Sequence, residues 1–271
     1  MSNAIQVTGL WKRYGRNPVL KGIDFHIASG ETFALLGVNG AGKTTALECI
    51  EGLKAYDSGT IMVNGKMGIQ LQSSSLPAHI KPMEAVRLFS KWNKAAINRS
   101  MLDALGIQEI EKKQYMQLST GQKRRLHLAL ALIGNPDIIF LDEPTAGLDV
   151  EGKLSLHSLI RQLKAQGKTI VLASHDMAEV ETLCDNIAIL NDGNITFYGT
   201  AAELSDKIGK KYSVQIKTQQ NVETVVTDDI GNTLLSLLTT LKEKGTKVLD
   251  IKVDQGTLEQ HFMEIVRRPV K

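Results

Sequence analysis

A glycine-rich segment with one lysine is the part of this sequence whose residue types point most directly to chemistry. Residues 37–45 read G-V-N-G-A-G-K-T-T, which matches the pattern G-x-x-x-x-G-K-[ST]. Glycines let backbone N–H groups converge on phosphate oxygens, and a helix N-terminus adds partial positive charge. The segment therefore predicts a phosphate site rather than a glycine-rich turn with a solvated lysine. Its candidate binding residues are Gly37, Asn39, Gly40, Ala41, Gly42, Lys43, Thr44 and Thr45.

Two carboxylates follow a second apolar run further along the chain. Residues 138–144 read I-I-F-L-D-E-P, so Asp142 and Glu143 stand where a buried strand is expected to end. Ligands bind at that end of the strands in open α/β sheets. Asp142 and the Thr44 hydroxyl are expected to hold Mg²⁺, and Glu143 to polarise the attacking water, while Lys43 supplies charge to the terminal phosphates. Alone, the two acids would fit an ordinary turn before a proline; with the phosphate pattern upstream, the catalytic interpretation is favoured.

The elements around these residues predict an α/β fold. An apolar strand over 32–36 precedes the glycine-rich loop, and a helix over 44–53 follows it. Strands and helices alternate again from residue 137 to 198, which implies right-handed crossovers and a parallel sheet. The further expected elements are strands at 137–141, 169–173, 187–190 and 194–198, and helices at 154–166 and 177–183.

The two ends of the chain and one insert depart from this alternation of strands and helices. An N-terminal β portion with antiparallel strands is expected before the glycine-rich loop, and a further strand over 59–65 after it. A mostly helical insert covers about 76–130. Past residue 204 a small α+β annex is expected, so the predicted domains are 1–204 and 205–271. The annex is expected to contain strands at 212–217, 222–227 and 247–253, and helices at 233–243 and 258–266.

Composition excludes several classes of protein. The chain has 271 residues, with 32 Lys and Arg against 29 Asp and Glu, a net charge of +3 that argues against a nucleic-acid partner. Two cysteines are too few for a disulfide scaffold and favour a reducing compartment. The best apolar run, residues 128–133, is far shorter than the roughly 20 residues of a spanning helix. With no apolar signal-peptide core near the N-terminus, a cytosolic protein is expected.

Further motifs resemble those of the ATP-binding-cassette (ABC) ATPases. Residues 118–122, L-S-T-G-Q, resemble the signature motif of that family, and residues 146–149, A-G-L-D, resemble its D-loop. His175 resembles the switch histidine, Gln72 the Q-loop glutamine, and Tyr14 the aromatic residue that stacks on adenine. These motifs occur in the family's order over residues 5 to about 204. The resemblance implies a P-loop NTPase of the ABC type that binds ATP and Mg²⁺ and hydrolyses ATP.

The resemblance also implies a role for each motif. The signature segment of one subunit would face the γ-phosphate bound by another, in a head-to-tail dimer with two ATP molecules between two copies. His175, with Lys43 and Glu143, would act in catalysis, and Gln72 would contact both nucleotide and metal. Without the motif set, His175 would be a structural or surface histidine, Tyr14 a half-buried strand residue and Gln72 a loop polar group. The interface residues implied are Ser119, Thr120, Gly121, Gln122 and Asp149.

Two positions depart from the family pattern. Thr120 stands where glycine is commonest, which adds a side chain beside the approaching phosphate. The segment between Gly65 and Gln72 is short, so Gln70 is an alternative to Gln72, which is preferred because residues 73–76 follow it as family loops do. Apart from the motif, Ser119 would be an ordinary helix N-cap.

Two classes of function compete. The C-terminal residues 257–265 resemble the tail of ATPases that work with ABC-2-type export permeases, so the first class is the ATPase subunit of an exporter with a separate membrane permease. That permease would dock at about residues 72–92, where Leu76, Phe89 and Trp92 could be docking or core residues, core being favoured for Phe89. Such a subunit would sit on the inner face of the plasma membrane. The alternative is a soluble ABC ATPase of DNA repair, cluster assembly or translation; a P-loop small-molecule kinase would lack the signature and the switch histidine.

Overall fold

The computed structural model describes residues 2–70, 75–174, 176–208, 212–219, 221–255 and 262. The chain forms two compact units, residues 1–198 and 199–271. The division therefore falls after Tyr198, a few residues before the expected boundary at 204, and it assigns the helix α7 (Ala201–Ile208) to the second unit.

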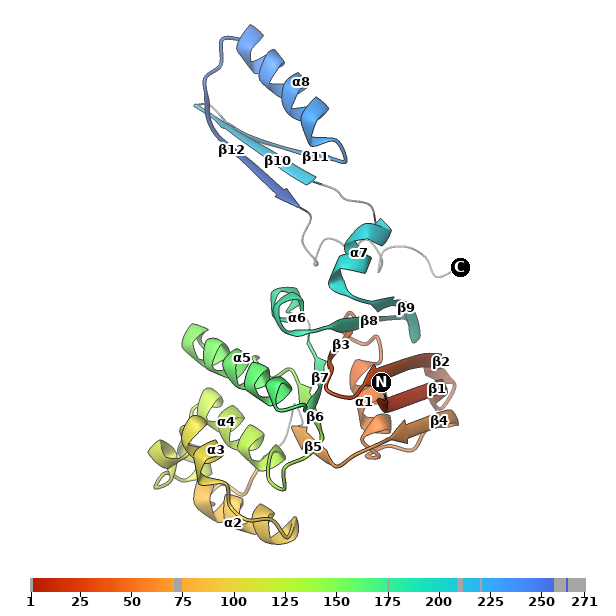
Figure 1. Ribbon diagram of the computed structural model, residues 1–271, viewed down its shortest axis with the longest axis vertical. Coiled ribbons are helices and arrows are strands. Elements are labelled where there is room, and N and C mark those ends of the chain that lie inside the picture. The colour runs from red at the N-terminus through yellow and green to blue at the C-terminus, as the bar shows by residue number, and fades with distance from the viewer. Residues whose placement is uncertain are drawn as a thin grey trace. The chain divides into compact units, whose positions relative to one another are not determined.

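A six-stranded sheet forms the centre of the first unit (Figure 1). Its strand order is β5-β6-β7-β3-β8-β9, and the pairs from β5 to β8 are parallel. β3, β6 and β7 are buried at every position, as the apolar runs predict. The α/β prediction is confirmed. The strands are β5 (Met67–Gln70), β6 (Ile138–Asp142), β7 (Thr169–Ala173), β3 (Thr32–Leu36), β8 (Asn186–Asn191) and β9 (Asn194–Gly199).

Helices cover this sheet and form the insert. α1 (Lys43–Ile50) follows the glycine-rich loop, and α5 (Val150–Ala165) and α6 (Met177–Leu183) follow β6 and β7. α1 ends three residues before the expected Leu53, because Gly52 has a φ of +74° that a helix cannot continue. The insert contains α2 (Pro82–Trp92), α3 (Arg99–Ala104) and α4 (Thr120–Ala131), with short 3₁₀ turns at Gln108–Ile110 and Tyr115–Gln117.

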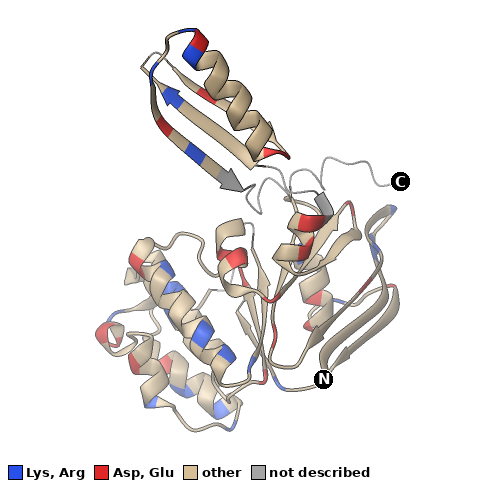
Figure 2. Cartoon of the chain, turned by 45° about the horizontal axis from the view of Figure 1, so that its top comes forward, with Lys and Arg blue, Asp and Glu red and all other residues tan. Residues whose placement is uncertain are grey.

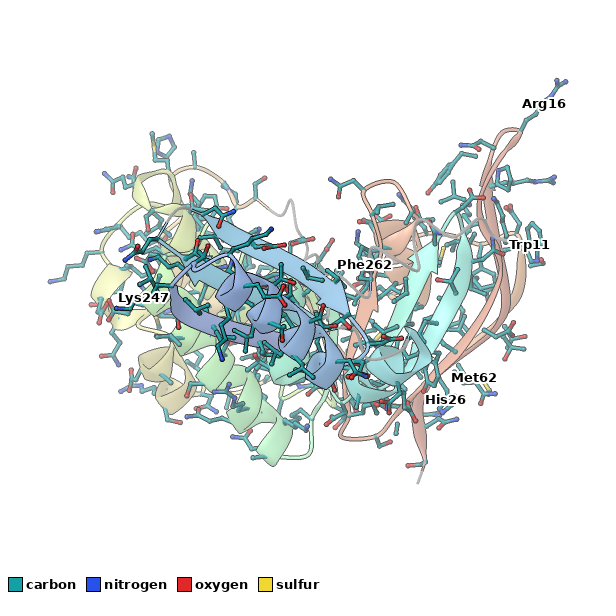
Figure 3. All side chains as sticks on the ribbon, turned by 90° about the horizontal axis from the view of Figure 1, so that it is seen from above. Trp11, Arg16, His26, Met62, Lys247 and Phe262 are labelled. Atoms are coloured by element: carbon teal, nitrogen blue, oxygen red, sulfur yellow. The ribbon has the colours of Figure 1, made fainter. Side chains whose placement is uncertain are left out.

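A second sheet in this unit confirms the antiparallel N-terminal portion. β1 (Asn3–Tyr14) pairs antiparallel with both β2 (Asn17–Ala28) and β4 (Ser58–Val63). Buried side chains of β1, β2, α1 and the central strands form one core, which places α1 between the two sheets. Trp11 and Met62 point outward from this antiparallel sheet, and Arg16 lies at the tip of the β1–β2 hairpin (Figure 3).

The second unit is an α+β annex. Its strands β10 (Tyr212–Thr218), β11 (Val222–Thr227) and β12 (Val248–Gln255) form an antiparallel sheet in the order β11-β10-β12. The helix α8 (Ile230–Glu243) packs on β10, whose Val214 and Ile216 are buried. The expected terminal helix 258–266 lies outside the described residues except for Phe262, which is helical.

Charged residues occur on helices of both units. Acidic and basic positions lie among one another on the helices (Figure 2). In the described part of the chain, each helix is too short or too polar to cross a bilayer.

Phe33 connects the two sheets of the first unit and offers a test of this core. Its ring stacks on Phe25 of β2 with centroids 5.5 Å apart and an interplanar angle of 4°, and it is fully buried. We expect Phe33→Ala to lower the free energy of unfolding by about 3–5 kcal/mol, because a cavity replaces the ring, and Phe33→Leu to cost less. Tryptophan fluorescence during urea unfolding reports this unit alone, since Trp11 and Trp92 both lie in it. A loss for Phe33→Ala below about 1 kcal/mol would contradict the packing described.

Candidate functional site

Three neighbouring strands end at one level and thereby gather the candidate residues. Leu35 of β3 and Asp142 of β6 are both paired with Ala173 of β7. The three strands are parallel, so their carboxyl ends meet at the same edge of the sheet. The glycine-rich loop after β3 and the two acids at the end of β6 therefore flank the residues that follow β7.

The glycine-rich loop requires its glycines for two different reasons. A Cβ on Gly37 would lie 2.5 Å from the Leu190 carbonyl oxygen, so only glycine fits between β3 and β8. Gly42, the N-cap of α1, has a φ of +108° and supplies no side chain to cap the helix. The first intrahelical bond runs from the Ala46 N–H to the Gly42 oxygen, 2.8 Å. The amides of the first turn therefore remain for an anion, as the sequence pattern predicts.

The Lys43 side chain folds over the glycine-rich loop and bonds to its first residue. Its ammonium donates to the Gly37 carbonyl oxygen at 2.6 Å. Burial lowers the pKa of Lys43, while the carboxylates of Glu143 and Asp142 act in the opposite direction. The lysine and both acids thus share one electrostatic environment at the end of the sheet, although they come from opposite sides of β7.

The acids are themselves crowded. Asp142 is 8% exposed, and burial raises its pKa, with Glu143 raising it further and Lys43 and Arg124 opposing. Glu143 has a φ of +49°, which places a non-glycine residue in the left-handed region. Its N–H donates to the Ala173 carbonyl oxygen of β7, 2.9 Å. Strained backbone of this kind persists where neighbouring contacts fix it, and such contacts are frequent at active sites.

The donor set fits a magnesium ion. Asp142 contributes a carboxylate whose negative charge is disfavoured by burial and by the neighbouring Glu143, so a cation would stabilise it. Thr44, an exposed residue on the first turn of α1, contributes a hydroxyl. These are oxygen ligands, which Mg²⁺ prefers, and a few of them suffice when phosphates and water complete the shell.

Two further acids, one in α1 and one at its C-cap, contribute to this environment and were missed by the sequence analysis. Glu48 forms an ion pair with Lys54 at 2.6 Å, and Glu51 is 8% exposed. Burial raises the pKa of Glu51 to about 7, with Asp142 and Glu48 adding to the shift. The spacing of Thr44, Glu48 and Glu51 places all three on one helix face, and this spacing was the signal that could have identified them.

The signature segment lies against the D-loop of the same chain. Ser119 caps α4: its Oγ accepts from the Gln122 N–H at 3.2 Å, and the Gln122 side chain accepts from the Ser119 N–H at 3.1 Å. The Thr120 methyl carbon lies 3.1 Å from the place a Cβ on Gly147 would occupy. Thr120 thus fits because residue 147 of the D-loop is glycine; a side chain at position 147 would collide with the Thr120 methyl group.

A cavity of about 650 Å³ lies between α4, the D-loop and α5, with Gln70, Ser119 and Asp149 in its lining. Asp149 caps α5, since its Oδ1 accepts from the Gly152 N–H at 2.8 Å. Gln70 is buried, and in the described part of the chain its Oε1 has no hydrogen-bond partner.

One side chain joins the signature helix to the acids. The guanidinium of Arg124, one turn into α4, donates to the Asp142 carbonyl oxygen at 3.3 Å. The signature helix is therefore fixed to the end of β6 as well as to the D-loop.

Tyr14 lies at the exposed end of β1. Its ring is 46% exposed, with the Lys12 and Lys54 ammonium groups 5.3 Å and 5.6 Å from its centroid. Since Lys54 also pairs with Glu48, Tyr14 is linked to the helix that follows the glycine-rich loop. Tyr14 is therefore partly open to solvent near the helix that follows the glycine-rich loop.

Two of the predicted residues lie outside the described part of the chain. Gln72 falls in the gap after β5, and His175 falls immediately after Ser174 at the end of β7. Their neighbours Gln70 and Ser174 are described, and both strands that lead to them end at the edge of the sheet that carries the glycine-rich loop.

Known proteins resemble this chain over most of its length. A profile of the ABC transporter family matches residues 20–146. The linearmycin resistance ATP-binding protein LnrL of Bacillus subtilis (strain 168) is 29% identical, over 98% of this chain and 99% of that protein. The Nod factor export ATP-binding protein I of Paraburkholderia xenovorans (strain LB400) is 36% identical over 76% of this chain and 74% of its own length. A solved ATP-binding subunit of an ABC transporter superposes with a TM-score of 0.71 at 25% identity, over 76% of this chain and 93% of that chain.

The buried carboxyl of Glu51 predicts a pH-dependent loss of stability. The pKa of Glu51 is about 7 in the folded chain and 4.5 in its ordinary state, which the unfolded chain resembles. Between these pH values only the folded chain keeps the proton, so the stability of the wild type falls as pH rises. Glu51→Gln cannot ionise. Relative to wild type, it should therefore gain stability from about pH 5 to about pH 8 in unfolding experiments without nucleotide. Glu181→Gln, at an exposed position of α6, is the control, and a pH-independent difference for Glu51→Gln would contradict the burial of a neutral acid.

Proposed function

This chain belongs to the ABC transporter family as an ATP-binding subunit that hydrolyses ATP, and we propose that it drives an exporter whose membrane permease is a separate polypeptide. The similarity to LnrL, named for resistance to linearmycin, extends over nearly the whole of both chains and so includes the annex. The Nod factor relative is named for export. These names favour an exporter over a soluble ATPase of repair, cluster assembly or translation.

The shared level at which β3, β7 and β6 end is the observation that best supports the assignment of the nucleotide site. The first-turn amides of α1 and the Lys43 ammonium would bind the β- and γ-phosphates, for which Lys43 exchanges its bond to Gly37. The loop residues from Gly37 to Thr45 form the cradle, and the exposed ring of Tyr14 stacks on adenine. Residues 1–198, with the boundary anywhere up to 204, form the nucleotide-binding domain in this proposal.

Hydrolysis needs a positioned water and compensation of charge. Glu143 accepts a hydrogen bond from the attacking water and aligns it with the γ-phosphorus. The bond from the Glu143 N–H to Ala173 fixes the backbone that carries this carboxylate. Mg²⁺, held by Thr44, Asp142 and Gln72, would neutralise charge on the phosphates. His175 follows the strand that lies between Lys43 and Glu143 in sheet order, which supports its role as a γ-phosphate contact.

The second half of each site comes from another copy of the chain. Ser119, Thr120, Gly121 and Gln122 begin a helix whose N-terminus suits an anion, and the D-loop with Asp149 lies beside it. A head-to-tail homodimer would place this end against the γ-phosphate of the partner. ATP binding then closes two sites at once, and hydrolysis opens them.

The permease would dock on the helical insert. Trp92 and Leu88 of α2 are 78% and 56% exposed, and Phe89, which is half-buried, supports the Trp92 ring at a centroid distance of 6.1 Å. Leu76, just after the Q-loop, is half-buried. Large apolar groups exposed together are typical of interaction surfaces. This interaction would hold the subunit at the inner face of the plasma membrane.

Replacing the proposed catalytic acid separates binding from hydrolysis. Glu143→Gln keeps the shape of the side chain but cannot polarise water, so ATP should bind with the affinity of the wild type while turnover falls by about a hundredfold or more. The variant should accumulate as a dimer in size-exclusion chromatography with light scattering when Mg²⁺ and ATP are present. Glu111→Gln, exposed in the insert, is the control. Wild-type turnover in Glu143→Gln would exclude this role.

Polar substitutions on α2 test the docking surface. Leu88→Ser with Trp92→Ser should leave the ATPase activity of the isolated subunit unchanged and abolish co-purification with its co-expressed permease, because the apolar contact area is lost. Met62→Ser, which removes an apolar side chain of β4 that is 47% exposed, should retain the complex. Retention of the complex by the α2 variant would move the interface elsewhere.

A further inference from the structure

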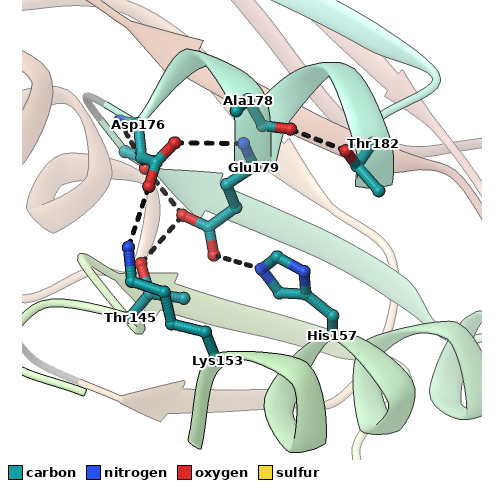
Figure 4. A network of polar contacts seen from close by, with 8 residues as sticks. Thr145, Lys153, His157, Asp176, Ala178, Glu179 and Thr182 are labelled. Carbon is teal, nitrogen blue, oxygen red and sulfur yellow. Dashed lines mark hydrogen bonds and ion pairs between the residues drawn. The ribbon is translucent and has the colours of Figure 1, made fainter. Parts of the chain in front are cut away.

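A buried carboxylate joins the segments that carry two of the proposed catalytic residues (Figure 4). Glu179 of α6 is 2% exposed, and its Oε2 accepts two hydroxyl hydrogen bonds. One comes from Thr145 at 3.1 Å and the other from Ser174 at 2.8 Å. Thr145 stands two residues after Glu143, and Ser174 stands immediately before residue 175. One oxygen atom thus ties the turn after β6 to the segment after β7.

Further contacts hold the start of α6, which carries Glu179, beside α5. The Glu179 N–H donates to Oδ1 of Asp176 at 3.2 Å, while Oδ2 of Asp176 pairs with the Lys153 ammonium of α5 at 3.1 Å. The other Glu179 oxygen, Oε1, faces Nε2 of His157 on α5 at 3.6 Å. α5 and α6 therefore both contribute to holding Glu179, and the hydroxyls of Thr145 and Ser174 are buried with it.

The sequence spacing alone suggests a different use of Glu179. Asp176 and Glu179 are three residues apart at the start of α6, a spacing typical of a capping box in which the glutamate returns to the N-cap backbone. Asp176 does cap the helix, but the Glu179 carboxylate turns away to the two hydroxyls. The N-cap N–H of Asp176 donates instead to the Ser174 hydroxyl oxygen, 3.1 Å.

We propose that Glu179 is a positioning residue for ATP hydrolysis, which holds the turn that carries Glu143 against Ser174 at the end of β7. The backbone of Glu143 lies in the left-handed region and is attached to β7 through the bond from its N–H to Ala173. The Thr145–Glu179–Ser174 bridge attaches the same turn to the same strand end a second time. Two attachments prevent the strained turn from relaxing, so the Glu143 carboxylate keeps the direction that in-line attack requires. The inference rests on the proposed catalytic role of Glu143.

Isosteric variants of the hydroxyl residues test it without opening a cavity. Thr145→Val removes only the hydrogen bond, so kcat should fall roughly ten- to a hundredfold while the Kd for ATP stays within about twofold of wild type. Thr145→Ser retains the hydroxyl and should restore most of kcat. Ser174→Ala also removes the bond from the Asp176 N–H, so its kcat should fall at least as far as that of Thr145→Val. The unfolding transition is measured for each variant.

A double substitution distinguishes positioning from general destabilisation. Glu179→Gln weakens the acceptor for both hydroxyls, so Glu179→Gln with Thr145→Val should be little slower than the slower single variant. Additive losses, loss of ATP affinity in parallel with kcat, or wild-type kcat in Thr145→Val would each overturn the inference. Glu143→Gln is run beside them. If it is inactive while Thr145→Val is fully active, only the positioning role fails; if it is active, the catalytic role of Glu143 fails first.

Discussion

The parallel pairing of β7 with both β3 and β6 is the constraint on which the rest of this molecule depends. It fixes the level at which three strands stop, and that level decides which side chains meet. A slip of one residue in either pair would turn every side chain of that strand to the opposite face of the sheet. Close packing opposes such a slip, because these strands are buried at every position and a slip would put each side chain into a space filled by a side chain of different shape. Core packing and site geometry are therefore a single problem in this chain.

The residues that could be predicted from sequence are those whose role is local. A glycine-rich loop between an apolar run and a helix carries its function within nine residues, and the two acids at the end of β6 were located by the same apolar pattern. For Ser119 the sequence allows two roles, a helix N-cap and a phosphate contact. In the structure its hydroxyl caps α4. The D-loop and the signature segment lie together in the structure, although nothing local to either motif implied the contact of Thr120 with Gly147.

The residues that could not be predicted depend on contacts across the fold. The pKa of Glu51 rises to about 7 because its carboxyl is buried beside Asp142 and Glu48, which the sequence alone does not reveal. Glu179 has the spacing of a capping residue and adopts another partner because Thr145 arrives from a different strand. The positive φ of Glu143 could not be predicted from the sequence, because glutamate rarely adopts the left-handed region. Each case requires the strand order to be known before the side chain can be interpreted.

The bond from Arg124 to the Asp142 carbonyl gives α4 a mechanical character. Twelve residues of α-helix form a rod about 18 Å long, which is too stiff to bend under side-chain contacts. α2 packs against this rod, the signature segment begins it, and Arg124 connects it to Asp142 at the end of β6. The insert and the end of β6 are therefore connected through one stiff element, so neither can shift along α4 without the other being affected.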